Sequence, residues 1–138
     1  MTALDLAFHG GMVLMIGLAA GLPFNMVILK NKSHDQIRAW RVAHSSLCMG
    51  GTAMIAFAAA LPILKMPALW EKILIISFVA SGYGFCFSMF LGASTGERGL
   101  TFFSGNAIYR LVYVGNFIGS AGSTIATACF IYGAWLVM

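Results

Sequence analysis

The segment LAFHGGMVLMIGLAAGLPFNMVIL, residues 6–29, decides the fold class, because it contains no Asp, Glu, Lys or Arg. A helix needs about 20 mostly apolar residues to cross the hydrocarbon layer of a bilayer. This segment is long enough. It also lacks the basic start of a cleaved signal peptide and is longer than the apolar region of one. We therefore expect a membrane-spanning helix over residues 6–29.

Three further apolar stretches follow, at about residues 39–64, 69–93 and 107–137. A transmembrane barrel would instead show segments of about 10 residues with alternating polarity. Long apolar runs favour helices, because a helix satisfies its backbone hydrogen bonds internally in lipid. The sequence therefore predicts an all-α integral membrane four-helix bundle, with residues 1–138 forming a single transmembrane domain.

The composition of the whole chain points to the same class. Of its 138 residues, 60% are hydrophobic and 9% are charged, whereas a soluble domain has about 25% charged residues. A soluble chain this short could not hide so much apolar surface. The composition thus excludes a soluble globule, a disordered chain and a collagen-like chain, and it makes the lipid bilayer the first expected partner.

The net charge of +4 has a topological interpretation. With four spans, the first and third connectors share one side of the membrane, and six basic residues lie in or beside them, against two on the side of the termini. Since basic residues collect on the cytoplasmic side, we predict a multi-pass protein of the cell inner membrane with both termini outside the cytoplasm. Nucleic acid is then not needed as a partner. The six are Lys30, Lys32, Arg38, Arg41, Arg98 and Arg110, and the two are Lys65 and Lys72.

Acidic groups are absent from the interiors of the apolar stretches. A small proton-coupled multidrug exporter needs a carboxylate buried in the membrane, so this class is disfavoured. The three cysteines lie within apolar stretches and show no CxxC spacing, which argues against a disulfide framework and a zinc site. The four acidic residues lie in connectors or near helix ends: Asp5, Asp35, Glu71 and Glu97.

His44 is the strongest candidate for a cofactor ligand. It lies about 5 Å along the helix from Arg41, near the cytoplasmic boundary of the hydrocarbon. Imidazole is a common ligand of metals and of haem iron. Cys48 and Gly51 follow on the same face, and the small Gly51 would leave space for a flat macrocycle. The alternative is a histidine that is hydrogen-bonded to a neighbouring helix and holds no ligand.

His9 is poorly placed to be a second ligand within one protomer. It lies near the outer end of the first span, and the distance to His44 approaches the roughly 30 Å thickness of the hydrocarbon core. A single histidine ligand with an open or weakly held sixth position favours ligand chemistry over simple electron transfer.

Three segments resemble the styrene oxide isomerases. Trp40-Arg41-Val42-Ala43-His44-Ser45 is similar to the Ala-His-Ser segment at the start of helix two in that family. The His9-Gly10 pair and the run Gly96-Glu97-Arg98-Gly99-Leu100-Thr101-Phe102 are similar as well. In the layout of four helices, the resemblance covers most of the chain.

The resemblance implies a trimeric membrane enzyme that holds haem b between protomers, with His44 as the iron ligand. It further implies that ferric iron acts as a Lewis acid on a small aryl or apolar epoxide, whose C–O bond opens before a hydride shift gives an aldehyde. A metal can stabilise the developing alkoxide charge, and a dry aromatic pocket would protect the cation. By side and depth, Arg41 and Arg98 are candidates for the haem propionates. Phe85, Phe87 and Phe90 are candidates for the pocket wall.

Two positions depart from the family's pattern. In the family, an asparagine and a tyrosine help to hold the substrate opposite the haem. Here Gly50 stands at the expected asparagine, and Met89 stands near the tyrosine, where its sulfur could be a weak iron ligand. We therefore assign Gly50, Phe87 and Met89 to the substrate pocket.

Other side chains would have to replace the two missing polar groups. Tyr83 and Asn116 are the candidate catalytic residues, with Tyr113 as a further possibility. Two other functions stay open. One is a haem b protein without isomerase activity that binds a gas or relays electrons. The other is a haem-free transporter component or assembly subunit.

Overall fold

The computed structural model of the protein describes residues 1–103 and 106–138. It contains four helical spans that are long and apolar enough to cross a membrane, and no strand occurs in the described residues. The predicted all-α four-helix membrane bundle is therefore confirmed. The elements are α1 (Ala3–Ala19), α2 (Gly21–Leu29), α3 (His34–Ala60), the short 3-10 helix η1 (Leu61–Ile63), α4 (Ala68–Thr95) and α5 (Ala107–Trp135).

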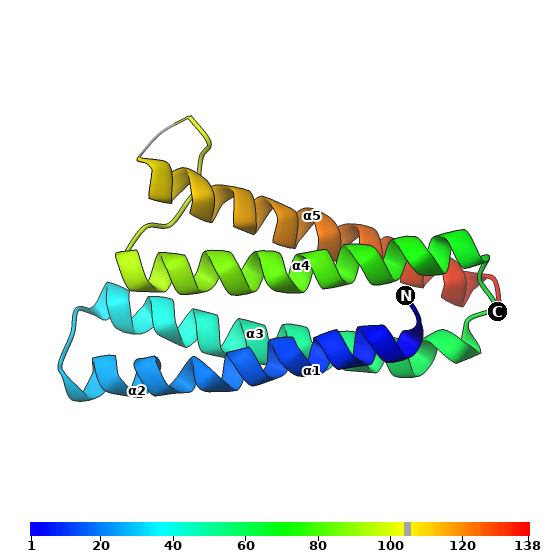
Figure 1. The fold of residues 1–138 in the computed structure, drawn as a ribbon, viewed down its shortest axis with the longest axis horizontal. Helices are drawn as coiled ribbons and strands as arrows, with labels where there is room; N and C mark the ends of the chain where they lie inside the picture. Colours follow the sequence, from blue (N-terminus) through cyan, green and yellow to red (C-terminus); the bar gives the residue numbers. More distant parts are fainter. Residues whose placement is uncertain (104–105) are drawn as a thin grey trace.

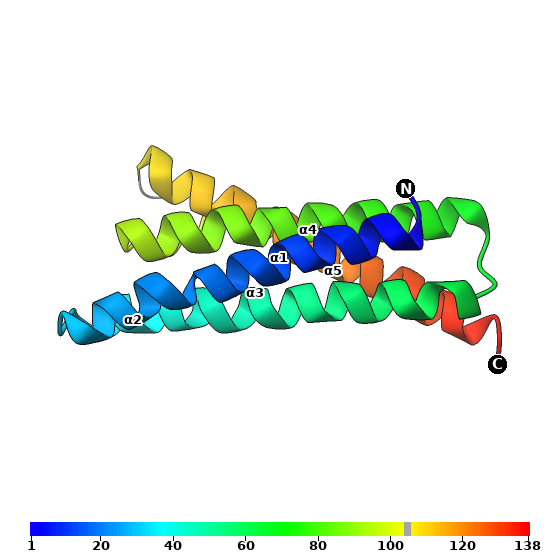
Figure 2. The ribbon, with the colours of Figure 1, turned by 60° about the horizontal axis from the view of Figure 1, so that its bottom comes forward.

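The helices are arranged as two antiparallel pairs (Figure 1). The combined rod of α1 and α2 lies along α3, and α4 lies along α5; these two pairs have the most extensive contacts in the bundle. Figures 1 and 2 show both termini at one end, together with the α3–α4 connection. The α2–α3 and α4–α5 connectors lie at the opposite end, which we call the connector end.

The first span is broken about two thirds of the way along its length. The α1 helix ends at Ala19 and α2 begins at Gly21. Pro23 lies in the first turn of α2, and a proline has no N–H to donate to the carbonyl four residues earlier, here that of Ala19. The sequence predicts a single helix over residues 6–29, so the break is a difference from the prediction.

Capping side chains explain why two spans begin earlier than predicted. The Thr2 and Asp5 side chains form a reciprocal capping box, so α1 begins at Ala3. The Ser33 hydroxyl accepts a hydrogen bond from the Gln36 N–H, so α3 begins at His34 rather than near residue 39. Such caps satisfy N–H groups that have no partner inside the helix.

Glycines bring the backbones of paired helices close together. A Cβ atom at Gly17 would lie 2.6 Å from the backbone nitrogen of Cys48, and one at Gly122 would lie 2.5 Å from the Ser77 carbonyl oxygen. Only glycine allows such approaches, and small residues are a usual means of helix packing in lipid. These glycines therefore allow the two helices of each pair to pack closely within one chain.

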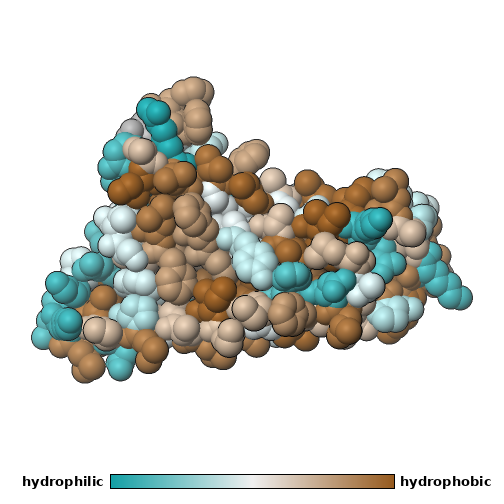
Figure 3. All heavy atoms as spheres, viewed as in Figure 1, coloured by the Kyte–Doolittle hydropathy of each residue, from teal (hydrophilic) through white to brown (hydrophobic). Residues whose placement is uncertain are grey.

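The exterior suits a bilayer. Figure 3 shows hydrophobic residues over much of one face, with hydrophilic residues toward both ends. Large apolar side chains such as Phe8, Met49 and Phe117 are exposed along the spans. Surface of this kind is stable in contact with lipid or with another copy of the chain.

Candidate functional site

His44 lies on α3 where this helix packs against the break between α1 and α2. Its Nδ1 atom is 2.8 Å from the carbonyl oxygen of Gly17. A carbonyl oxygen only accepts, so Nδ1 carries the proton and donates it. The Nε2 atom then keeps its lone pair, and it makes no hydrogen bond with any residue among 1–103 and 106–138. This is the tautomer of a histidine that binds a metal through Nε2 while a backbone carbonyl orients the ring.

Neighbouring side chains restrict the orientation of the His44 ring. Phe24 stacks on it with ring centroids 6.3 Å apart and planes 24° from parallel. A Cβ atom at Gly21 would lie 3.4 Å from its Cε1 atom. The Cys48 Sγ lies 3.9 Å from Nδ1. The bond to Gly17, the Phe24 ring and Cys48 thus restrict the orientation of the His44 ring, and Gly21 leaves room for it.

The expectation that Gly51 leaves space for a macrocycle is wrong. Gly51 is buried, and a Cβ atom there would lie 2.5 Å from the Leu14 nitrogen and 2.7 Å from the Gly10 carbonyl oxygen. The α1 backbone therefore fills the space that the sequence left for a flat cofactor. The spacing of Gly51 from His44 reflects close packing of α1 on α3, and a group bound at Nε2 would have to extend away from Gly51.

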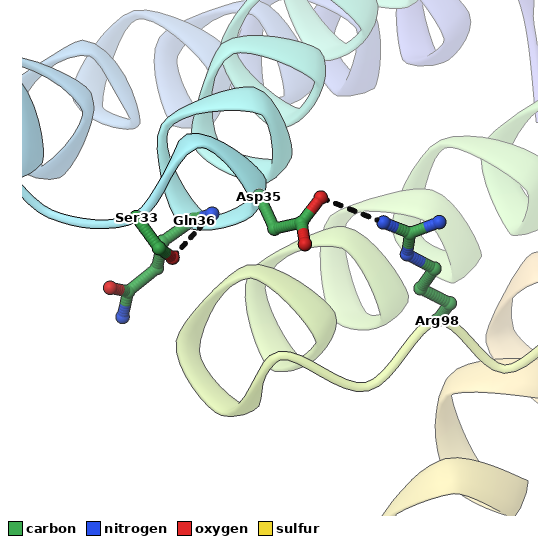
Figure 4. A network of polar contacts seen from close by, with 4 residues as sticks. All are labelled: Ser33, Asp35, Gln36 and Arg98. Carbon is green, nitrogen blue, oxygen red and sulfur yellow. Dashed lines mark hydrogen bonds and ion pairs between the residues drawn. The ribbon is translucent and has the colours of Figure 1, made fainter.

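Arg98 and Arg41 lie on different sides of α3. Arg98, on the α4–α5 connector, forms an ion pair with Asp35 near the start of α3, with 3.0 Å between Nη2 and Oδ1 (Figure 4). Arg41 is exposed, and it lies about 120° around the α3 axis from Asp35, the partner of Arg98. Within one chain, the two arginines that the sequence assigned to the same propionates do not converge.

A polar cavity of about 480 Å³ lies between α3, α4 and α5 at the connector end. Asp35 and Arg98 both line it, and so does the predicted catalytic residue Asn116. The Asn116 Nδ2 donates to the Arg98 carbonyl oxygen over 3.5 Å. Asn116 is therefore part of a polar wall near the connector.

An apolar cavity of about 250 Å³ lies deeper in the bundle. Gly50 and Met89, two of the three residues predicted for the substrate pocket, both line it. Met89 lines the polar cavity too, so its side chain stands between the two spaces. The remaining lining residues come from α1, α3, α4 and α5: Val13, Ser46, Leu47, Met54, Phe78, Ser81, Gly82, Phe85 and Ser123.

His44 and the apolar cavity lie on different faces of α3. His44 and Gly50 are six residues apart, which turns them about 120° from each other around the helix axis. His44 faces the break between α1 and α2, and Gly50 faces α4. One chain alone therefore does not bring the histidine and the cavity to a common centre.

Tyr83 is not placed to serve this pocket, which corrects the prediction that it is catalytic there. Its hydroxyl is hydrogen-bonded to His9 Nδ1 over 2.9 Å, on the surface between α1 and α4. Tyr83 is 38% exposed and lines neither cavity. The local sequence around Tyr83 did not indicate its partner, because His9 is distant in the chain.

Two other aromatic predictions need the same correction. Phe87 is 51% exposed on the outer surface and lines neither cavity. Phe90 packs edge-on against Trp40, with ring centroids 5.4 Å apart. Of the three phenylalanines expected at the pocket wall, Phe85 lines the apolar cavity. Tyr113, the further possibility, stacks on Phe117.

Three serines that line the apolar cavity were not predicted from the sequence. Ser46, Ser81 and Ser123 come from three different helices. The spacing of Ser46 from Gly50 could have indicated one of them, since residues four apart share a helix face.

Comparison with known proteins gives one family. A family model described as styrene oxide isomerase matches residues 2–135, which is nearly the whole chain. No curated protein matches the chain. The match includes every predicted site residue, from Arg41 on α3 to Asn116 on α5.

Proposed function

Because this chain belongs to the styrene oxide isomerase family, we propose that it isomerises a small aryl or apolar epoxide to an aldehyde within the membrane. The family match over residues 2–135 carries this proposal. The apolar cavity supports it, because a dry space suits both an apolar substrate and a reaction that water would divert.

Haem b is the proposed cofactor, and His44 Nε2 would hold its iron. The hydrogen bond from Nδ1 to Gly17 leaves Nε2 its lone pair, so this residue fits the role. No group of three His, Cys, Asp or Glu residues that could hold a bare metal ion occurs in the described part of the chain. A group that brings its own ring nitrogens to the iron needs only one such ligand. When bound, ferric haem would supply a Lewis acid for the epoxide oxygen.

A homotrimer is the proposed assembly. His44 and the apolar cavity lie on different faces of α3, so a site that uses both needs two copies, with His44 of one facing the cavities of the next. In such a site, Arg41 of one copy and Arg98 of another could both approach the propionates. Glycine-lined helices with exposed apolar faces are suited to close packing in lipid.

The chain's own residues would protect the reacting carbon. As the C–O bond breaks, positive charge develops on the carbon next to the aryl ring. Phe78 and Phe85 line the apolar cavity, and aromatic faces attract positive charge. A hydride then moves to that carbon from its neighbour, so the reaction needs no external redox partner.

The connector end is proposed to face the cytoplasm in a cell inner membrane. Six basic residues lie at or near that end, and Lys65 and Lys72 lie at the other. Basic residues in short loops favour the cytoplasmic side. A cysteine-reactive, membrane-impermeant reagent applied to cells with Asn31→Cys or Lys65→Cys would test this orientation, with labelling from outside expected for Lys65→Cys alone.

A haem b protein without isomerase activity is the second candidate. Gly50 and Met89 favour it, since neither brings the polar group expected at that position in the family. The test is an absorption spectrum of the purified protein with a pyridine haemochrome assay, followed by incubation with styrene oxide and no added cofactor. We expect one haem per chain and formation of the aldehyde. Haem without aldehyde would favour the second candidate. If the protein contains no haem, the remaining candidate function is a haem-free transporter component or assembly subunit.

A further inference from the structure

We propose that the Ser46 hydroxyl binds the oxygen atom of a small aryl ligand in the apolar cavity, in place of the two polar groups that this chain lacks. The proposal rests on the proposed function for the identity of the natural ligand, an aryl epoxide. It makes Ser46 a positioning residue that donates one hydrogen bond to the ligand oxygen.

The first observation is that the Ser46 proton has no acceptor within the described residues. Serines in helices commonly donate to the carbonyl four residues earlier. Two neighbours on α3 do so: Ser45 donates to Arg41 over 2.9 Å, and Thr52 donates to Cys48 over 2.9 Å. Ser46 makes no such bond, and its side chain lines the apolar cavity. Ser46 is partly exposed, and no buried side-chain oxygen or nitrogen among the described residues lacks a partner. Its hydroxyl is therefore accessible, and an acceptor atom of a ligand in the cavity can receive its hydrogen bond.

The second observation is that the other two serine hydroxyls of the cavity already donate hydrogen bonds to backbone carbonyls. Ser81 Oγ donates to the Gly119 carbonyl over 2.6 Å, and Ser123 Oγ donates to the Ser120 carbonyl over 3.0 Å. Each of these bonds uses the single proton of its serine. Among the described residues around this cavity, Ser46 is therefore the hydroxyl with a proton to offer.

The third observation is the space beside Ser46. Gly50 lies one turn further along the same face, and a Cβ atom there would meet nothing within 4 Å. The cavity measures about 250 Å³, and an apolar cavity of about 150 Å³ is known to bind benzene. An aromatic ring with a two-carbon substituent fits such a volume, with its oxygen near Ser46 and its ring near Phe78 and Phe85.

The test compares two ligands of the same shape. Acetophenone carries one acceptor oxygen, and α-methylstyrene has a CH₂ group in its place; neither has a C–O single bond that the protein could open. Equilibrium dialysis against the purified holoprotein in lipid nanodiscs gives the affinity for each. We expect wild type to prefer acetophenone, and Ser46→Ala to lower its affinity for acetophenone about three- to tenfold, the range for one net hydrogen bond. The affinity for α-methylstyrene should stay unchanged.

Two further variants make the comparison specific. Ser45→Ala is the matched control, because Ser45 lies next in sequence but is exposed and bonded to Arg41; it should bind both ligands as wild type does. Gly50→Asn in the Ser46→Ala background should restore the preference for acetophenone, since the open space at Gly50 admits an amide donor. If Ser46→Ala does not fold, Ser46→Cys, whose thiol is a weak donor, should show the same loss.

The outcomes separate this proposal from the proposed function. Equal binding of acetophenone by wild type and Ser46→Ala would overturn the role of Ser46, even if the protein isomerises styrene oxide. No preference for acetophenone in wild type would overturn it as well. A preference that depends on Ser46 in a protein without isomerase activity would uphold the oxygen site and reject the isomerase function.

Discussion

The Nδ1 atom of His44 on α3 lies 2.8 Å from the carbonyl oxygen of Gly17 on α1. The helix that carries the ring therefore differs from the helix that orients it. The bond exists because α1 approaches α3 closely at Gly17, where a side chain would collide with the α3 backbone. Any change that separates these two helices should alter the ring's orientation before it alters the fold.

His44→Ala should lose haem, because the variant removes the histidine proposed to hold the iron. The pyridine haemochrome assay on purified protein measures this loss as haem per chain. His34→Ala is the control, since His34 is exposed at the start of α3, and it should keep the wild-type haem content. Wild-type haem content in His44→Ala would show that the ligand assignment is wrong.

Gly17→Ala should destabilise the protein by about 1–3 kcal/mol, the usual cost of overpacking, and should lower its haem content. A Cβ atom there would lie 2.6 Å from the Cys48 nitrogen, so α1 must shift and the bond to His44 must lengthen. Gly11→Ala, on the same helix with nothing within 4 Å of a Cβ atom, should be as stable as wild type. Thermal unfolding in detergent compares the two, and equal stability would contradict the packing described here.

Tyr83→Phe should leave both haem content and isomerase activity near the wild-type values. Tyr83 lies on the surface between α1 and α4, where it is bonded to His9, and it does not line the apolar cavity. The loss of this hydrogen bond should cost about 0.5–1.5 kcal/mol of stability. A fall in kcat/KM of tenfold or more at unchanged haem content would restore Tyr83 as a catalytic candidate.

If the protein holds the proposed haem, chemical reduction of its iron should slow isomerisation, because Lewis acidity falls as the charge on the metal falls. The rate of aldehyde formation from styrene oxide, measured before and after anaerobic dithionite treatment, tests this. Reoxidation by air should restore the rate and serves as the control for damage. An unchanged rate in the ferrous protein would reject the ferric Lewis-acid mechanism.

Asp35→Asn should change the free energy of unfolding by less than about 1 kcal/mol, because exposed ion pairs contribute little. The side chains of Asp35 and Arg98 are 80% and 63% exposed, so water already solvates both charges. Thermal unfolding at low and high salt measures the effect, with Lys32→Gln as an exposed control. A larger loss would mean that the pair is buried by another copy of the chain.

The spans could be predicted from the sequence because their length and apolar character alone determine a membrane-spanning helix. The break between α1 and α2 was harder to predict than the spans. It depends on the missing N–H of Pro23, and the apolar character of the sequence does not change there. His44 could be selected as a candidate ligand because a histidine inside the hydrocarbon is rare; its role as a ligand stays a prediction.

The faces of the helices were harder to predict. The spacing of Gly51 from His44 is compatible with a ligand-binding face and with a helix-packing face. Only the position of α1 in the structure shows that Gly51 serves helix packing. Tyr83 and Phe87 lie in the right helix for the pocket but point to the outer surface. Ser46 went unnoticed because a lone serine in an apolar helix usually bonds to its own backbone.

Met89 is the side chain that both cavities share, and its chemistry has a kinetic consequence. Methionine is unbranched and has several rotatable bonds. A rotation of this one side chain would change the width of the opening between the wet and the dry compartment without any helix movement. Side-chain rotations of this kind take picoseconds to nanoseconds where there is room, far less than a typical catalytic cycle. The rotation of Met89 would then not be the step that limits turnover.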